Sequence, residues 1–169
     1  MQDANDFSAL AEQIEHMNSE LLALTSELDA FAERAITITK QKKRGLPIKD
    51  TTFAGDFSLL CTKTGAFVSK SEDFWRSLNS VVRDGKVPQD NSIAVRGVGA
   101  KARQINKAME EFVSVFRYVQ STAKSCPVTL NMWTLETHAS DLERISGKIL
   151  FVTRELSKSV EQSARRQQP

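Results

Sequence analysis

Four cations stand close together between the first two apolar-patterned segments of the chain: Lys42, Lys43, Arg44 and Lys49. A fifth, Lys124, closes a later segment, and in a bundle whose helices alternate in direction it comes to the same end as the other four. Ammonium and guanidinium groups gathered in this way can bind phosphate groups of a nucleic acid or of anionic lipids. We therefore predict a candidate site for a partner or a phosphate at these five residues.

The same cations also have an ordinary structural explanation. Lys and Arg in the last turn of a helix complement the negative end of its dipole, and they keep a following loop hydrated. Proteins that bind single-stranded nucleic acid place aromatic side chains among their cations, and no aromatic residue interleaves with the cations here. The apolar residues Leu46, Pro47 and Ile48 interrupt the basic loop, where they either pack as a lid or dock a partner. A second basic cluster is expected at the opposite end of the bundle. It comprises Arg96, Lys101, Arg103, Arg165 and Arg166.

Neither histidine has the spacing of a metal site in a helical bundle. Such a site uses inward-facing Glu residues and Glu-x-x-His pairs. Gln13 stands three residues before His16, and Leu135 stands three residues before His138. His138 falls on an apolar helix stripe, where a histidine bonded within the core or its boundary is the expected role.

The cysteines and glycines show no catalytic pattern either. Two cysteines give neither a disulfide framework nor the spacing of zinc ligands. Cys61 lies beside the apolar stripe and is expected to be a small buried residue, while Cys126 falls in the last loop. Gly97 and Gly99 lack the preceding strand and the following Lys-Ser or Lys-Thr of a phosphate-binding loop. We predict no enzyme, no catalytic residue, no cofactor and no metal.

The elements that must position these residues are long helices. In four segments the apolar residues alternate spacings of three and four, which places one side chain per turn on a single helix face. The period of two that a strand requires is missing. The first stripe is Phe7, Leu10, Ile14, Met17, Leu21, Leu24, Leu28, Phe31, Ala35 and Ile38.

Glycine and proline mark the boundaries between these segments. Gly45 and Pro47 end the first, Gly85 ends the second, and Pro127 precedes the fourth, with Ser125 or Cys126 at the position of a cap. We predict an all-α fold, an antiparallel up-down four-helix bundle with long helices, in a single domain 1–169. The rival architecture is a homodimeric coiled coil through the first helix. The predicted helices are 6–41, 52–84, 92–124 and 128–164.

The charge is divided unevenly along the chain. Residues 1–41 contain eight acidic and two basic residues, a net charge of −6, so the remainder carries +8 within a total of +2. Such a division steers either a pairing between helices of the same chain or the approach of a charged partner. The first interpretation predicts ion pairs from the first helix to its neighbours.

No targeting or membrane-spanning signal is evident. The acidic start MQDANDF lacks the basic and apolar regions of a signal peptide, and no apolar run approaches the ~18–20 residues that span a bilayer. We expect an intracellular protein, cytoplasmic by default, with the nucleus as an alternative.

These patterns favour a non-enzymatic protein–protein interaction module. It would act as an adaptor, scaffold, tether or assembly subunit of a complex, and would present helix faces to another protein or to a second copy of itself. The alternative is a phosphate-binding module for nucleic acid or an anionic membrane, acting through the basic loop 40–49.

Overall fold

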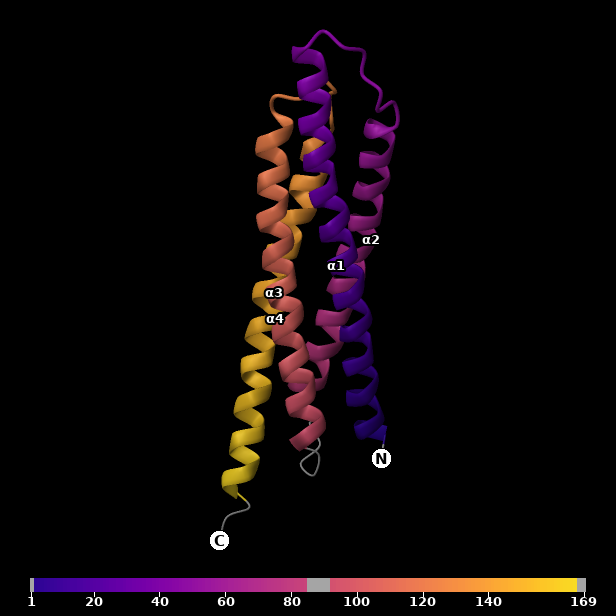
Figure 1. The fold of residues 1–169 in the computed structure, drawn as a ribbon. Coiled ribbons are helices and arrows are strands. Elements are labelled where there is room, and N and C mark those ends of the chain that lie inside the picture. The colour runs from indigo at the N-terminus through magenta and orange to yellow at the C-terminus, as the bar shows by residue number, and fades with distance from the viewer. Residues whose placement is uncertain (1, 85–91, 167–169) are drawn as a thin grey trace.

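The computed structural model describes residues 2–84 and 92–166. Within them the chain forms four helices, α1 (Gln2–Lys43), α2 (Phe53–Arg83), α3 (Ser92–Ala123) and α4 (Met132–Arg166). Figure 1 shows the helices lying side by side along one axis, with consecutive helices running in opposite directions. The predicted all-α four-helix bundle is confirmed.

The order of the helices around the bundle differs from their order in the chain. α1 packs against α2 and, most extensively, against α3, while α4 packs against α3 and α2. Over the described residues α2 and α3 make no packing contact, so these two helices occupy diagonal corners. The α1–α3 and α2–α4 pairs are parallel and the α1–α2 and α3–α4 pairs are antiparallel (Figure 1).

The core is built from the predicted apolar stripes. All ten residues of the α1 stripe are buried, and they meet a single cluster that contains residues from every helix. Each fully buried Leu, Ile or Phe contributes about 1.5–3 kcal/mol. Among the buried polar residues, Thr64 and Ser71 of α2 donate their hydroxyls to the carbonyls of Leu60 and Phe67 in their own helix, so neither is left without a partner.

The fourth helix begins at Met132, later than the predicted start at 128 and well after the predicted caps Ser125 and Cys126. Pro127 disfavours helical backbone at the residue before it. Val128 and Leu130 pack against the core from a non-helical segment, and burial of these side chains favours that segment over another turn of helix. Asn131, a residue type preferred just before helices, immediately precedes α4.

The acidic face of α1 meets cations from its neighbours. Glu15 pairs with Lys101 of α3 at 2.6 Å, and Glu20 and Glu27 pair with Lys70 and Lys63 of α2 at 2.9 and 3.6 Å. The hydrogen bond from Lys101 lowers the pKa of the Glu15 carboxyl. These pairs are largely exposed and therefore add little stability, but they set three of the eight acids of residues 1–41 against cations of α2 and α3.

None of the four described helices carries an apolar stretch long enough to cross a bilayer.

Candidate binding surfaces

The tip loop, residues 44–52, joins α1 to α2 at one end of the bundle. Figure 1 shows that it extends beyond the connection between α3 and α4. The predicted residues Lys42, Lys43, Arg44 and Lys49 are all exposed on it or on the helix turn that leads into it. Lys124 is also exposed and lies at the same end of the bundle, but at the end of α3. Four of the five residues thus belong to one stretch of chain, and the fifth comes from a different connection at the same end.

A helix-ending turn fixes the first part of the tip loop. Gly45 adopts a φ of 70°, in the left-handed region that glycine enters without strain. Its backbone N–H donates to the Lys42 carbonyl at 3.0 Å, and the N–H of Leu46 donates to the Gln41 carbonyl at 2.9 Å. This pair of bonds is the Schellman arrangement, which satisfies the last carbonyls of α1 and directs the chain away from the helix.

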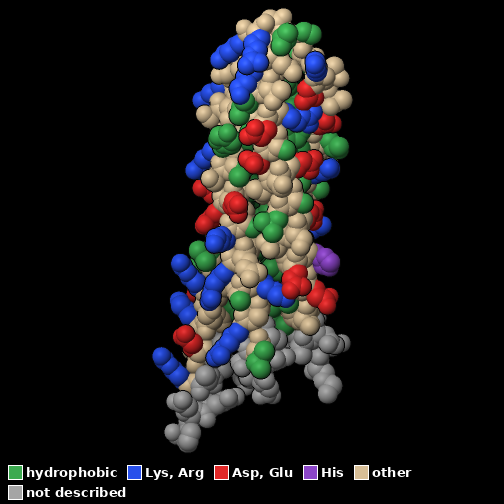
Figure 2. Space-filling view, viewed as in Figure 1, with side chains coloured by type: hydrophobic (Ala, Val, Ile, Leu, Met, Phe, Trp, Pro, Cys, Tyr) green, Lys and Arg blue, Asp and Glu red, His purple; other side chains and the backbone are tan. Residues whose placement is uncertain are grey.

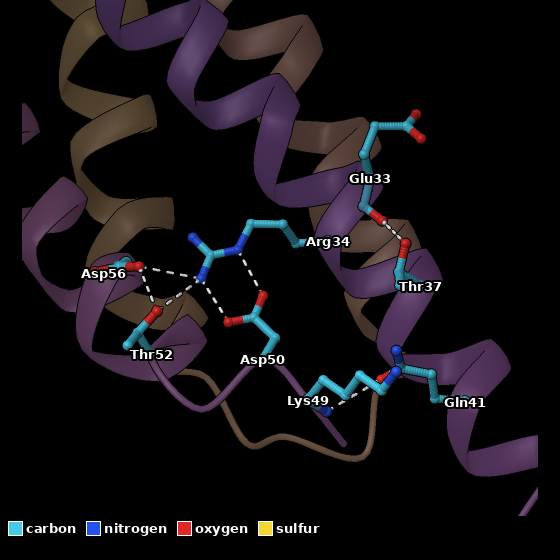
Figure 3. Close-up of polar contacts among 8 residues, drawn as sticks. All are labelled: Glu33, Arg34, Thr37, Gln41, Lys49, Asp50, Thr52 and Asp56. Carbon is cyan, nitrogen blue, oxygen red and sulfur yellow. Dashed lines mark hydrogen bonds and ion pairs between the residues drawn. The ribbon is translucent and has the colours of Figure 1, made fainter. Parts of the chain in front are cut away.

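The Arg34 clamp, formed by Arg34, Asp50, Thr52 and Asp56, fixes the second part (Figure 3). From α1, Arg34 donates through Nε and Nη2 to the two carboxylate oxygens of Asp50, at 2.7 and 2.8 Å. The same Nη2 reaches Asp56 Oδ2 at 3.1 Å and Thr52 Oγ1 at 3.3 Å. A forked pair of this kind is stronger and more directional than a single contact.

The guanidinium of Arg34 also lies against aromatic rings of the core. Its carbon is 4.9 Å from the centre of the Phe31 ring and 5.2 Å from that of Phe53. The hydrogen bond from Arg34 lowers the pKa of the Asp50 carboxyl, and the bond to Asp50 raises the pKa of Arg34. The clamp therefore ties the start of α2 to α1 and neutralises the acid nearest the tip.

The clamp predicts a pH-dependent loss of stability in Arg34→Met, which keeps the packing on the rings but removes the charge. We expect a loss of about 1 kcal/mol at pH 7. Because the pKa of Asp50 is lower in the folded than in the unfolded state, its contribution is present above about pH 4 and disappears as pH falls further. The difference between the two proteins in urea unfolding should therefore shrink as the pH is lowered from 5 to 3. Arg76→Met, which removes an exposed pair within α2, is the control, and an Arg34→Met difference that is as large at pH 3 as at pH 7 would contradict the assignment.

A second charged surface, the basic groove, lies between α3 and α4 towards the opposite end of the bundle. Two adjoining hollows of about 390 and 460 Å³ form it and share Arg103 and Ser157. Arg96 and Arg103 line it from α3, and Arg154 and Lys158 line it from α4. Figure 2 shows Lys and Arg side chains gathered over this lower part of α3 and α4.

Few acids offset the cations of the basic groove. No ion pair among residues 2–84 and 92–166 involves Arg96, Arg103 or Arg154. Lys158 pairs with Glu155 at 3.4 Å, and Glu161 lines one end of the groove. Apolar atoms of Val95, Leu150 and Leu156 contribute to its lining.

Only two of the four cations that line the basic groove, Arg96 and Arg103, are predicted from the sequence. The prediction groups them with Lys101, but the Lys101 side chain forms an ion pair with Glu15 of α1 instead. Arg154 and Lys158 were missed, although their spacing of four residues, with Ser157 between them, already placed two cations on one face of a helix.

A third hollow, of about 380 Å³, lies between α2 and the start of α4 and is lined by Cys61, Gly65 and His138 among others. A Cβ at Gly65 would lie 3.0 Å from Cε1 and Nε2 of His138, so the glycine makes room for the ring. Burial raises the pKa of the Cys61 thiol, which disfavours the reactive thiolate. Within the described part of the chain no three His, Cys, Asp or Glu residues are grouped to hold a metal.

Comparison of the chain with protein-family models, with curated proteins and with solved structures finds no match.

Proposed function

We propose that this protein is a non-enzymatic interaction module that binds an acidic helical segment of another protein in the basic groove. The observation that supports this proposal is the combination of exposed arginines with apolar lining in two adjoining hollows between the antiparallel helices α3 and α4. A helix laid in such a groove buries its apolar face and directs its flanking carboxylates at the cations.

The spacing of the cations suits a helical partner. Arg96 and Arg103 are seven residues apart on α3, which is about 10 Å along the axis, and Arg154 and Lys158 are about 6 Å apart on α4. Acidic residues repeated at three-, four- and seven-residue intervals on a partner helix would face the two arginines of α3 and the two cations of α4. The backbone that carries these cations is helical, so binding does not have to order a loop.

An exposed aromatic side chain lies outside the lining of the groove, on the same helix as two of its cations. Phe151 lies one helical turn before Arg154 on α4, and 64% of its surface is exposed. Exposed aromatic residues next to arginine are the side-chain types that most often dominate the binding energy of protein interfaces. Phe151 is therefore the expected apolar anchor beside the cations.

A nucleic acid is a poorer fit to the groove than an acidic helix. The Glu161 carboxylate lines one end, and a continuous phosphate backbone would pass within reach of this like charge. The half-buried Leu150 in the lining also rewards an apolar side chain rather than a sugar-phosphate chain. An acidic helix can place apolar residues over the lining and leave the Glu161 end unoccupied.

Site-specific photo-crosslinking in native cells tests this proposal. With Phe151 replaced by p-benzoylphenylalanine, we expect a crosslink to a defined protein through an acidic segment. The same photoreactive residue at Leu59, which is similarly exposed on α2, should not give that product. Arg103→Glu with Arg154→Glu should weaken capture of the identified segment by roughly 30-fold or more, because each of the two arginine contacts contributes about 1 kcal/mol or more.

Two results would contradict the proposal. One is a crosslinked product that forms equally from position 59, and the other is an identified segment that is basic or whose binding is unaffected by the two charge reversals. A product that disappears on nuclease treatment would identify nucleic acid as the ligand of the groove instead.

A further inference from the structure

We propose that the tip loop is a second and separate docking site, which binds the surface of an anionic lipid bilayer. Its exposed aliphatic residues would enter the headgroup region while the surrounding cations contact lipid phosphates. This inference does not depend on the basic groove, because the two surfaces lie at opposite ends of the bundle and share no residue (Figure 1).

The tip combines two kinds of exposed side chain. Leu46 and Ile48 are 53% and 37% exposed, and Pro47 between them is exposed as well, so this apolar segment does not close over the bundle as a lid. Arg44 precedes the segment and Lys49 follows it, with Lys42 and Lys43 in the last turn of α1. A short apolar apex flanked by cations is complementary to the apolar interior and negative surface of an anionic bilayer.

The charge of the tip is not opposed by acids. Residues 40–49 contain no Asp or Glu. Asp50, the first acid that follows, has its carboxylate engaged by Arg34 through two hydrogen bonds, and Asp56 is bound to the same guanidinium. The Arg34 clamp thus withdraws both acids on this side of the tip from the surface that would face the lipid.

The backbone of the tip is held in place before any ligand binds. The glycine turn at Gly45 anchors one side, the clamp anchors the other, and the N–H of Lys49 donates to Gln41 Oε1 at 3.4 Å (Figure 3). An anchored loop loses less conformational freedom on binding than a disordered one. The aliphatic apex also distinguishes among polyanions, because a nucleic acid offers no apolar phase in which Leu46 and Ile48 could be buried.

Sedimentation with lipid vesicles tests this inference. The intact chain should bind vesicles of phosphatidylcholine that contain phosphatidylserine, and should not bind vesicles of phosphatidylcholine alone. Combined Lys42→Gln, Lys43→Gln and Arg44→Gln should weaken binding roughly 100-fold, since each cation near an anionic surface raises the affinity about fivefold. Leu46→Ser should weaken it roughly tenfold through lost apolar burial.

Matched controls exist on α2. Combined Lys63→Gln, Lys70→Gln and Arg76→Gln removes the same charge, and Leu59→Ser alters a leucine with the same 53% exposure as Leu46. Both should bind phosphatidylserine vesicles as the unaltered chain does. Circular dichroism establishes that every variant is folded.

Several results would overturn the inference. Absence of binding to phosphatidylserine vesicles does so directly, as does equal weakening by the α2 control. If the charge variant loses binding but Leu46→Ser does not, charge alone holds the tip at the lipid phosphates, and the proposed entry of its aliphatic residues into the headgroup region is wrong. Tighter binding to duplex DNA or RNA than to vesicles, lost in the same charge variant, would assign the tip to nucleic acid.

Discussion

Leu21→Asp is expected to unfold the bundle, whereas Leu22→Asp at the next position should leave it folded. Leu21 has no exposed surface and belongs to the core cluster, while Leu22 is 48% exposed. A carboxylate at position 21 would be buried without a partner, at a cost of several kcal/mol. This approaches the total stability of a typical domain, about 5–15 kcal/mol.

Thermal unfolding followed by circular dichroism, together with gel filtration, measures this contrast. We expect Leu21→Asp to lose its cooperative transition or to melt far below the unaltered protein, and Leu22→Asp to melt within a few degrees of it. Similar melting of the two variants would contradict the assignment of the α1 stripe to the core.

Phe112→Ala should lower the free energy of unfolding by about 3–5 kcal/mol, through lost transfer energy and the cavity left behind. Phe112 lies on α3 with no exposed surface. Phe151→Ala removes the same atoms from a largely exposed position on α4 and should change stability by no more than about 0.5 kcal/mol.

Urea unfolding separates the two phenylalanine variants. The midpoint of Phe112→Ala should fall while the slope of the transition stays unchanged, because the same surface is exposed on unfolding. A loss from Phe151→Ala comparable to that from Phe112→Ala would show that Phe151 packs in the fold, and would remove it as an interface anchor.

The sequence alone predicts the helices and their buried faces well, because both depend on local spacing. The run from Phe7 to Ile38 advances by three or four residues at each step, and every member is buried. The glycine turn at Gly45 was likewise readable, since a glycine just after a basic last turn is a common way to end a helix. The exposed cations of the tip follow from the same local pattern.

The partners of each helix face are not encoded locally. A stripe shows which face is buried, but it does not show that α1 lies along α3 rather than only along α2. The basic groove depends on this tertiary arrangement, because Arg103 and Arg154 are brought together only by packing of α3 on α4. For the same reason the Arg34 clamp, which joins residues 16 and 22 positions apart, was not foreseen.

The delayed start of α4 shows where local rules compete. Pro127 correctly marked a boundary, yet helical backbone resumes only at Met132. Val128 and Leu130 reach the core from the intervening segment, so burial determines where the helix begins. Spacing of apolar residues carries no information about such a choice.

The packing of α1 on α3 and of α2 on α4 makes the molecule two helical hairpins laid side by side. Successive units of a solenoid protein stack in this manner, and each unit added needs an apolar face to receive it. The next hairpin of such an array would lie on the outer surface of α3 and α4. That surface bears Arg96, Arg103 and Arg154, so its chemical complement is an acidic surface rather than the uniformly apolar face of a further solenoid unit.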